Sequence, residues 1–170
     1  MKKSSIVALG AVGLLSVLLV IGYLASRSAP ERITKDEAVT MLNEMKSAVE
    51  KKNVGVIMEA MAPSPEGKYA EMNREQLRMV LARAFQGSGD LTPEFKKITF
   101  DGGNLAATLA FDVSVKNKQG GMSADDYKAH IILYLKRVEV PRLWGVVKAM
   151  DWRITKAEST GPNMSTFGEF

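Results

Sequence analysis

The chain has 170 residues, a formal net charge of +4 and no cysteine. The absence of cysteine excludes disulfides, cysteine-based metal sites and a thiol nucleophile. Four of the 23 basic and one of the 19 acidic residues lie before residue 33, which leaves a net charge of +1 for residues 33–170. A nearly neutral domain lacks the basic stripe that binding to a phosphate backbone requires, so we expect no nucleic-acid partner.

No charged residue interrupts the apolar segment from Ile6 to Leu24, which follows two lysines. A transmembrane helix needs about 20 apolar residues, and residues 6–25 supply them. The alternative is a cleavable signal peptide, whose apolar core is usually about 7–15 residues long; the only acceptable cleavage position here follows Ser28. The lack of a following cysteine excludes a bacterial lipoprotein. We therefore expect residues 6–25 to enter the lipid bilayer as one retained span.

The orientation of this span follows from the charges beside it, because positive charge next to a span tends to stay in the cytoplasm. Two lysines precede the span and two arginines follow it, which is nearly balanced. A short basic head rarely crosses a membrane, so we expect residues 1–5 in the cytoplasm. Residues 26–33 would then be a linker, and the domain would lie on the periplasmic or extracytoplasmic side of the inner (plasma) membrane.

Three helices are predicted by capping residues followed by apolar positions at helical spacing. Thr34 and Asn73 each have a Glu or Gln three residues later, which is the pattern of a capping box. Asn53 begins a short helix that Pro63 stops, and glycines stop the third helix. The predicted helices cover about residues 35–52, 54–61 and 73–87, and residues 62–71 are predicted to be a polar loop.

The apolar period changes from 3.6 to 2 after the third predicted helix, which indicates strands. Two adjacent glycines predict a two-residue hairpin turn, with Asp101 opposite Asn104 and Phe100 opposite Leu105. A polar loop is predicted over residues 117–126, and the segment after residue 158 is predicted to be a flexible tail, 159–170. The four predicted strands cover residues 95–101, 104–116, 127–138 and 143–155.

Three helices packed on a curved antiparallel sheet of about four strands define one α+β domain, residues 34–158. Its opening helix, the continuation Val49–Met58 into a short second helix, and the strand residues Trp144 and Trp152 resemble the NTF2-like (SnoaL-like) superfamily. This resemblance implies a cone with an internal pocket. The superfamily includes enzymes, ligand binders and scaffolds, so the fold alone does not assign a function. A span followed by such a domain is similar to the inner-membrane scaffold proteins of type IV secretion systems.

The inside of the predicted cone is apolar. Methionines there can fill gaps in a core or form an adaptable surface for a ligand or partner, and their core spacing favours the first interpretation. The residues expected to line a pocket, if one is present, are Met41, Met45, Phe111, Leu133, Trp144 and Trp152.

Alternation along the third predicted strand places His130, Ile132 and Tyr134 on the outer face of the sheet, where they would face a partner. His130 is the only histidine and thus the first candidate for acid–base chemistry. Asp112 and Asp151 are the next candidates, and alternation directs both outward. We therefore predict no catalytic residue and no cofactor. We also predict no metal site, because the carboxylates lack ligand spacing.

These features favour a membrane-anchored, non-enzymatic interaction or scaffold module, an accessory subunit of a larger membrane or envelope complex. Its outer sheet face would bind a protein partner or a second copy. One alternative is a binder of a small apolar ligand, and cleavage after Ser28 would favour a soluble, exported form of it. The other is a SnoaL-type enzyme, which requires His130, Asp112 or Tyr134 to point into a cavity.

Overall fold

The computed structural model describes the chain from residue 27 to residue 160, apart from 64–66, 70–71, 120–121, 143–144 and 146. The predicted head, the predicted span and most of the predicted tail lie outside the described residues. Within residues 27–160 no helix combines the length and the apolar character that crossing a membrane requires. The chain divides into two compact units, Glu31–Val138 with Trp152–Phe170 and Met1–Pro30 with Glu139–Asp151.

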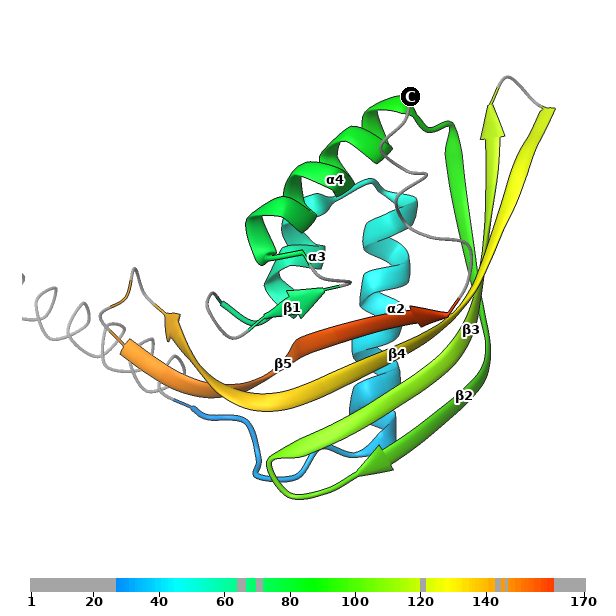
Figure 1. Ribbon diagram of the computed structural model, residues 1–170. Coiled ribbons are helices and arrows are strands. Elements are labelled where there is room, and N and C mark those ends of the chain that lie inside the picture. The colour runs from blue at the N-terminus through cyan, green and yellow to red at the C-terminus, as the bar shows by residue number, and fades with distance from the viewer. Residues whose placement is uncertain are drawn as a thin grey trace, which may run out of the picture. The chain divides into compact units, whose positions relative to one another are not determined.

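The described part of the chain contains three α-helices, as predicted: α2 (Lys35–Glu50), α3 (Val54–Ala60) and α4 (Arg74–Gly87) (Figure 1). Both capping boxes are confirmed. At the start of α2 the Glu37 N–H donates to Thr34 Oγ1 at 3.3 Å, and the Thr34 N–H donates to the Glu37 carboxylate at 2.8 Å. Local capping therefore fixes where the helices begin.

Replacing the cap residue Thr34 with alanine is expected to lower the free energy of unfolding by about 1 kcal/mol, because the Glu37 N–H in the first turn loses the hydroxyl that accepts its hydrogen bond. Chemical denaturation followed by circular dichroism measures the change. Thr40→Ala is the matched control: its hydroxyl donates to the Asp36 carbonyl within the same helix, and its loss removes no cap. Equal losses in the two variants would contradict the capping role.

The described strands form one five-stranded sheet in the order β1-β5-β4-β3-β2. The pairs β2–β3 and β3–β4 are antiparallel, whereas β1 runs parallel to β5, so the sheet is mixed and the expectation of four antiparallel strands is wrong. The additional strand, β1, lies inside the predicted 62–71 loop and is too short to show a period. The strands are β1 (Lys68–Tyr69), β2 (Asp90–Gly102), β3 (Ala106–Gln119), β4 (Met122–Arg142) and β5 (Val147–Thr160).

The predicted register of the β2–β3 hairpin is also wrong. Instead of Asp101 opposite Asn104, the structure pairs Gly102 with Ala107, and residues 103–106 make the connection. Between Thr99 and Gly102 the pairing is displaced by four residues, an even number, so these side chains keep the face that alternation assigned to them. Beyond the irregularity between Lys96 and Thr99 the displacement is three residues, so Phe95 lies on the inner face, where its ring packs on Phe111.

The larger turn is explained by contacts with segments remote in sequence. The Leu105 N–H donates to the Glu31 carbonyl at 3.1 Å, and the Leu105 carbonyl accepts from the Arg137 N–H at 3.2 Å. Leu105 has a φ of 67°, in the left-handed region that leucine rarely adopts. A pattern of neighbouring residues cannot reveal these bonds.

The polar loop predicted over residues 117–126 is mostly strand. Asn117 pairs with Ala124 and Gln119 pairs with Met122, so β3 and β4 continue through this segment. The gap between the predicted strands 127–138 and 143–155 likewise lies within β4, which continues to Arg142. Backbone pairing needs no apolar side chains, which is why a polar sequence concealed the ends of these strands.

The core of the larger unit lies on the inner face of β3 and β4. Leu109 is 1% exposed and faces Leu133, and Phe111 faces Ile131 on the next pair. From Ala107 to Val115 and from Tyr127 to Leu135 the inward positions alternate as the sequence indicated, and all but Tyr127 have wholly apolar side chains. The helices contribute Ala38, Leu42 and Ala48 from α2, Ile57 and Met58 from α3, and Leu77 and Phe85 from α4.

In the described part of the smaller unit, hydrogen bonds connect the expected linker with the start of β5. The Ala29 N–H donates to the Met150 carbonyl at 2.6 Å, and the Met150 N–H donates to Ser28 Oγ at 3.1 Å. In the same unit Asp151 forms an ion pair with Arg142 at 3.1 Å. Residue 29 is therefore held by a backbone hydrogen bond, and residue 28 by its side-chain hydroxyl.

Candidate functional site

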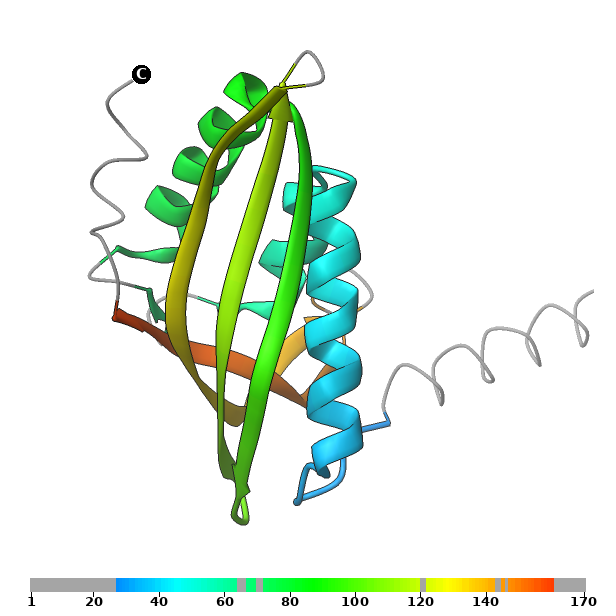
Figure 2. The same ribbon diagram turned by 90° about the vertical axis from the view of Figure 1, so that its right-hand side faces the viewer.

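The candidate site is the outer face of β2, β3 and β4. Figure 2 shows α4 on the far side of these strands and no described element in front of them. His130, Ile132 and Tyr134 alternate with buried residues along β4 and therefore point to this face. Alternation in the sequence predicts the same placement.

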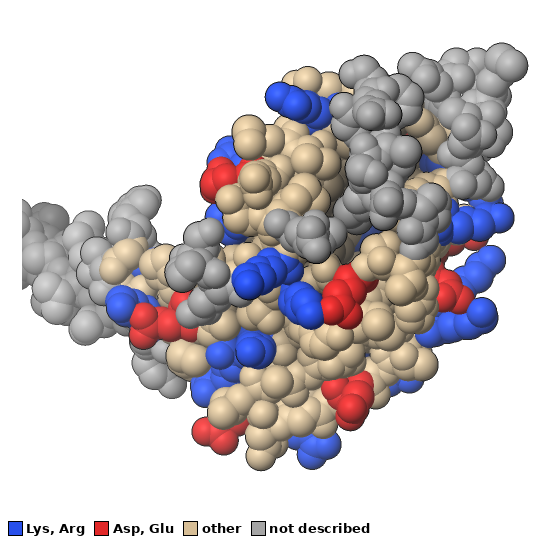
Figure 3. All heavy atoms as spheres, in the orientation of Figure 1, with Lys and Arg blue, Asp and Glu red and all other residues tan. Residues whose placement is uncertain are grey.

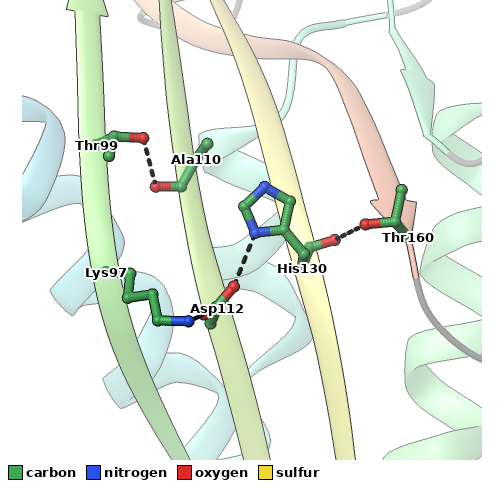
Figure 4. A network of polar contacts seen from close by, with 6 residues as sticks. All are labelled: Lys97, Thr99, Ala110, Asp112, His130 and Thr160. Carbon is green, nitrogen blue, oxygen red and sulfur yellow. Dashed lines mark hydrogen bonds and ion pairs between the residues drawn. The ribbon is translucent and has the colours of Figure 1, made fainter.

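One polar cluster on this face joins three strands (Figure 4). Asp112 lies directly opposite His130, and its Oδ1 is 2.8 Å from His130 Nδ1. Its other oxygen is 2.9 Å from Lys97 Nζ. Lys97 occupies the irregularity between Lys96 and Thr99 in β2 and has a φ of 52°; such a bulge re-aims a side chain. We call Lys97, Asp112 and His130 the acid–base cluster.

The acid–base cluster holds its carboxylate in the charged form. The hydrogen bond from His130, followed by that from Lys97, lowers the pKa of Asp112 below its ordinary value. Asp112 in turn fixes the orientation of the imidazole through Nδ1. The side chains of His130 and Asp112 are 43% and 37% exposed, so the cluster lies on an open strand face, whereas small-molecule sites are usually concave.

A second polar cluster, made of Tyr134, Lys156 and Glu158, connects β4 with β5. The Tyr134 hydroxyl donates to Glu158 Oε2 at 2.9 Å. The Lys156 ammonium contacts the other oxygen of Glu158 and lies 5.1 Å from the centre of the Tyr134 ring. The bond from Lys156, then that from Tyr134, lowers the pKa of Glu158. We call this group the tyrosine cluster.

An apolar pair lies between the two clusters. Ala110 and Ile132 are directly opposite each other on β3 and β4, and both are half-buried. Their neighbours along the strands belong to the acid–base cluster on one side and include Tyr134 on the other. An apolar centre within a polar rim is the usual composition of a protein interface.

The charges around this site are mixed. On β2, Glu94 forms ion pairs with Lys116 at 2.9 Å and Lys96 at 3.7 Å. On the face seen in Figure 3, basic and acidic side chains are interspersed over the described surface. Among the described residues, no group of three or more His, Asp or Glu side chains could hold a metal ion.

The residues predicted to line a pocket lie in several environments. Phe111 and Trp152 are 4% exposed, and the Phe111 ring packs edge-to-face on Phe95 at 5.0 Å. Leu133 is also 4% exposed. The α2 residues Met41 and Met45 are half-buried, and Trp144 lies outside the described residues.

Two features of the surface were not found from the sequence. The Asp112–His130 contact was missed because it depends on the β3–β4 register, which was not worked out. The second feature is a shallow groove on α4. The spacing of the methionines favours core positions for them, but the Met79 side chain on α4 is 56% exposed. The groove is lined by Met72, Gln76, Met79, Val80 and Arg83.

Comparison with known proteins identifies the fold. Neither a family model nor a curated protein matches the chain. An NTF2-like superfamily protein from Salmonella enterica serovar Typhimurium matches with a TM-score of 0.60 at 16% identity, covering 80% of this chain and 96% of that one. An NTF2-like protein of unknown function from Pseudomonas putida matches with a TM-score of 0.56 at 12% identity, covering 78% and 89%.

A third solved structure has a similar fold. It is a putative calcium/calmodulin dependent protein kinase II association domain from Xanthomonas campestris, with a TM-score of 0.55, 14% identity, and coverage of 82% of this chain and 97% of that one. Similarity at such low identity defines the fold alone. The chain therefore has an α+β, NTF2-like fold, as the sequence resemblance indicated.

Proposed function

We propose that this chain is a membrane-anchored, non-enzymatic interaction module. Residues 6–25 form its single span, the N-terminus is cytoplasmic, and the domain lies on the periplasmic or extracytoplasmic side. The outer sheet face binds a second copy of the chain or another subunit of a membrane complex. This arrangement is similar to that of the inner-membrane scaffold proteins of type IV secretion systems.

The observation that carries this proposal is the apolar Ala110–Ile132 pair between two ordered polar clusters, on a sheet face that none of the described elements covers. A contact surface gains affinity when its side chains are already ordered, because binding then immobilises fewer of them. The acid–base cluster and the tyrosine cluster are each held by hydrogen bonds within the chain. The Xanthomonas protein of similar fold is a putative kinase association domain, which is consistent with this use of the fold.

The inner face supports the non-enzymatic part of the proposal. The inward residues of β3 and β4 present apolar side chains, apart from the Tyr127 hydroxyl. The three residues that the enzymatic alternative requires inside a cavity, Asp112, His130 and Tyr134, all lie on the outer face. General acid–base catalysis requires such a group within hydrogen-bonding reach of an enclosed substrate.

Replacing Ile132 with lysine is expected to weaken association by about 30-fold or more, since a charge at the centre of an interface costs about 2 kcal/mol or more. The measurement is the molar mass of the full-length chain in mild detergent, by light scattering after size-exclusion chromatography, over a range of concentrations. Met79→Lys, an exposed change on α4, is the control and should associate like the wild type.

Two outcomes would contradict the proposed interface. One is a wild-type chain that remains monomeric and co-purifies with no protein. The other is equal association of the Ile132→Lys and Met79→Lys variants. Native mass spectrometry of the same sample tests the alternative function, because a bound apolar molecule would favour the ligand binder.

A further inference from the structure

The β2–β3 connection, residues 103–106, presents an apolar side chain to the solvent. Leu105 is 53% exposed and is one of three large hydrophobic residues of the described chain that are exposed. Its φ of 67° is strained for leucine. Its N–H and carbonyl are both bonded to other segments of the chain. Strain combined with exposure is unusual for a residue that serves packing alone, and often marks a functional position.

The segment that follows the proposed span holds this connection in place. Arg32 forms an isolated bridge with Asn104, and the carbonyl of Glu31 accepts from Leu105. Figure 1 shows the chain passing the β2–β3 connection immediately before α2. Residues 31 and 32, which lie near the end of the expected linker, are therefore joined directly to the connection that carries the exposed leucine.

The length of the chain limits how far this connection can lie from the proposed span. Glu31 lies six positions after Ala25, and an extended chain of six steps spans at most about 22 Å. Basic side chains lie next to Leu105: Arg32 is exposed, and Lys136, also exposed, lies opposite Ala106. Their cations can contact lipid phosphates, whereas the nearby Glu31 and Asp101 offset the charge of these two cations.

From these contacts we infer that the β2–β3 connection rests on the phospholipid headgroup layer of the bilayer that holds the anchor. Leu105 enters the layer, and Arg32 and Lys136 contact lipid phosphates. An apolar side chain flanked by cations is the composition of segments that lie in the membrane interface. This inference depends on the proposed anchor, and it assigns a second membrane contact beyond the span.

The absence of cysteine allows the test to use single labels. The full-length Leu105→Cys variant carries a fluorophore and is reconstituted in phospholipid nanodiscs. We expect nitroxide-bearing lipids to quench its fluorescence and aqueous iodide not to quench it. Met79→Cys is the matched control, because Met79 is equally exposed but lies on α4, and its label should show the reverse behaviour.

The outcomes separate this inference from the proposed anchor. A chain that inserts into nanodiscs while its label at position 105 stays open to iodide overturns the headgroup contact alone. A chain that does not associate with nanodiscs overturns both. Leu105→Gly provides a second test, because glycine adopts this φ without strain. This variant should have a higher midpoint of thermal unfolding in detergent than the wild type. A lower midpoint would mean that Leu105 serves packing, against the inference.

Discussion

Replacing Tyr69 with alanine is expected to lower the free energy of unfolding by about 3–5 kcal/mol, as for other buried aromatic side chains. Tyr69 is 2% exposed, and its side chain is one of the largest fully buried side chains among the described residues. Its hydroxyl donates to the Ile154 carbonyl at 2.8 Å. Tyr69→Phe should cost only about 1 kcal/mol, because the Ile154 carbonyl still accepts from the Ala62 N–H. Urea unfolding of the full-length variants measures both changes.

The same residue should produce an alkaline transition. Burial raises the pKa of Tyr69 from 10 to about 12, so the folded state favours the neutral phenol. The stabilisation from this group is complete below pH 10 and is lost as the pH rises towards 12. The difference in unfolding free energy between wild type and Tyr69→Phe should therefore shrink between pH 10 and pH 12.

The control for Tyr69 is Tyr134→Phe, which removes a hydroxyl bonded to an exposed carboxylate and should change stability by less than about 0.5 kcal/mol. Ultraviolet titration of phenolate formation provides an independent reading. If the difference spectrum between wild type and Tyr69→Phe titrated near pH 10, the phenol would not be buried in solution.

Tyr69 also shows where the sequence stopped being informative. The helices were predicted to within about two residues because Thr34, Asn53 and Asn73 act on the turn that follows each of them. Tyr69 was assigned to a loop, since nothing near it in sequence indicates that Ile154, 85 residues away, accepts its hydroxyl proton. The β2–β3 turn was wrong for the same reason, because remote contacts to Leu105 determine it.

The candidate site shows the same division between local and remote information. Alternation alone placed His130, Ile132 and Tyr134 outward, because strand periodicity is local. The partners of these residues depend on how the strands align. Asp112 meets His130 only in the observed β3–β4 register, and Glu158 reaches Tyr134 from the last strand. A face can therefore be predicted from one strand, whereas a cluster requires at least two.

The second large effect concerns the inner face and decides between a filled core and a ligand pocket. Phe111→Ala is expected to lower the free energy of unfolding by about 3–5 kcal/mol, because Phe111 is 4% exposed and its ring packs against Phe95. A double-mutant cycle with Phe95→Leu should give a coupling of about 0.5–1.5 kcal/mol. Urea unfolding in detergent measures each variant.

The amount by which Phe111→Ala lowers the free energy of unfolding bears directly on function. A ring surrounded by close-packed neighbours leaves a costly cavity, whereas a ring at the wall of an existing pocket removes fewer contacts when it is deleted. Val113→Ala, the next inward position on β3 and only half-buried, is the control and should cost about 1 kcal/mol. If Phe111→Ala cost no more than this control, the ring would border open space. The apolar-ligand alternative would then be favoured over an interaction module built on a solid core.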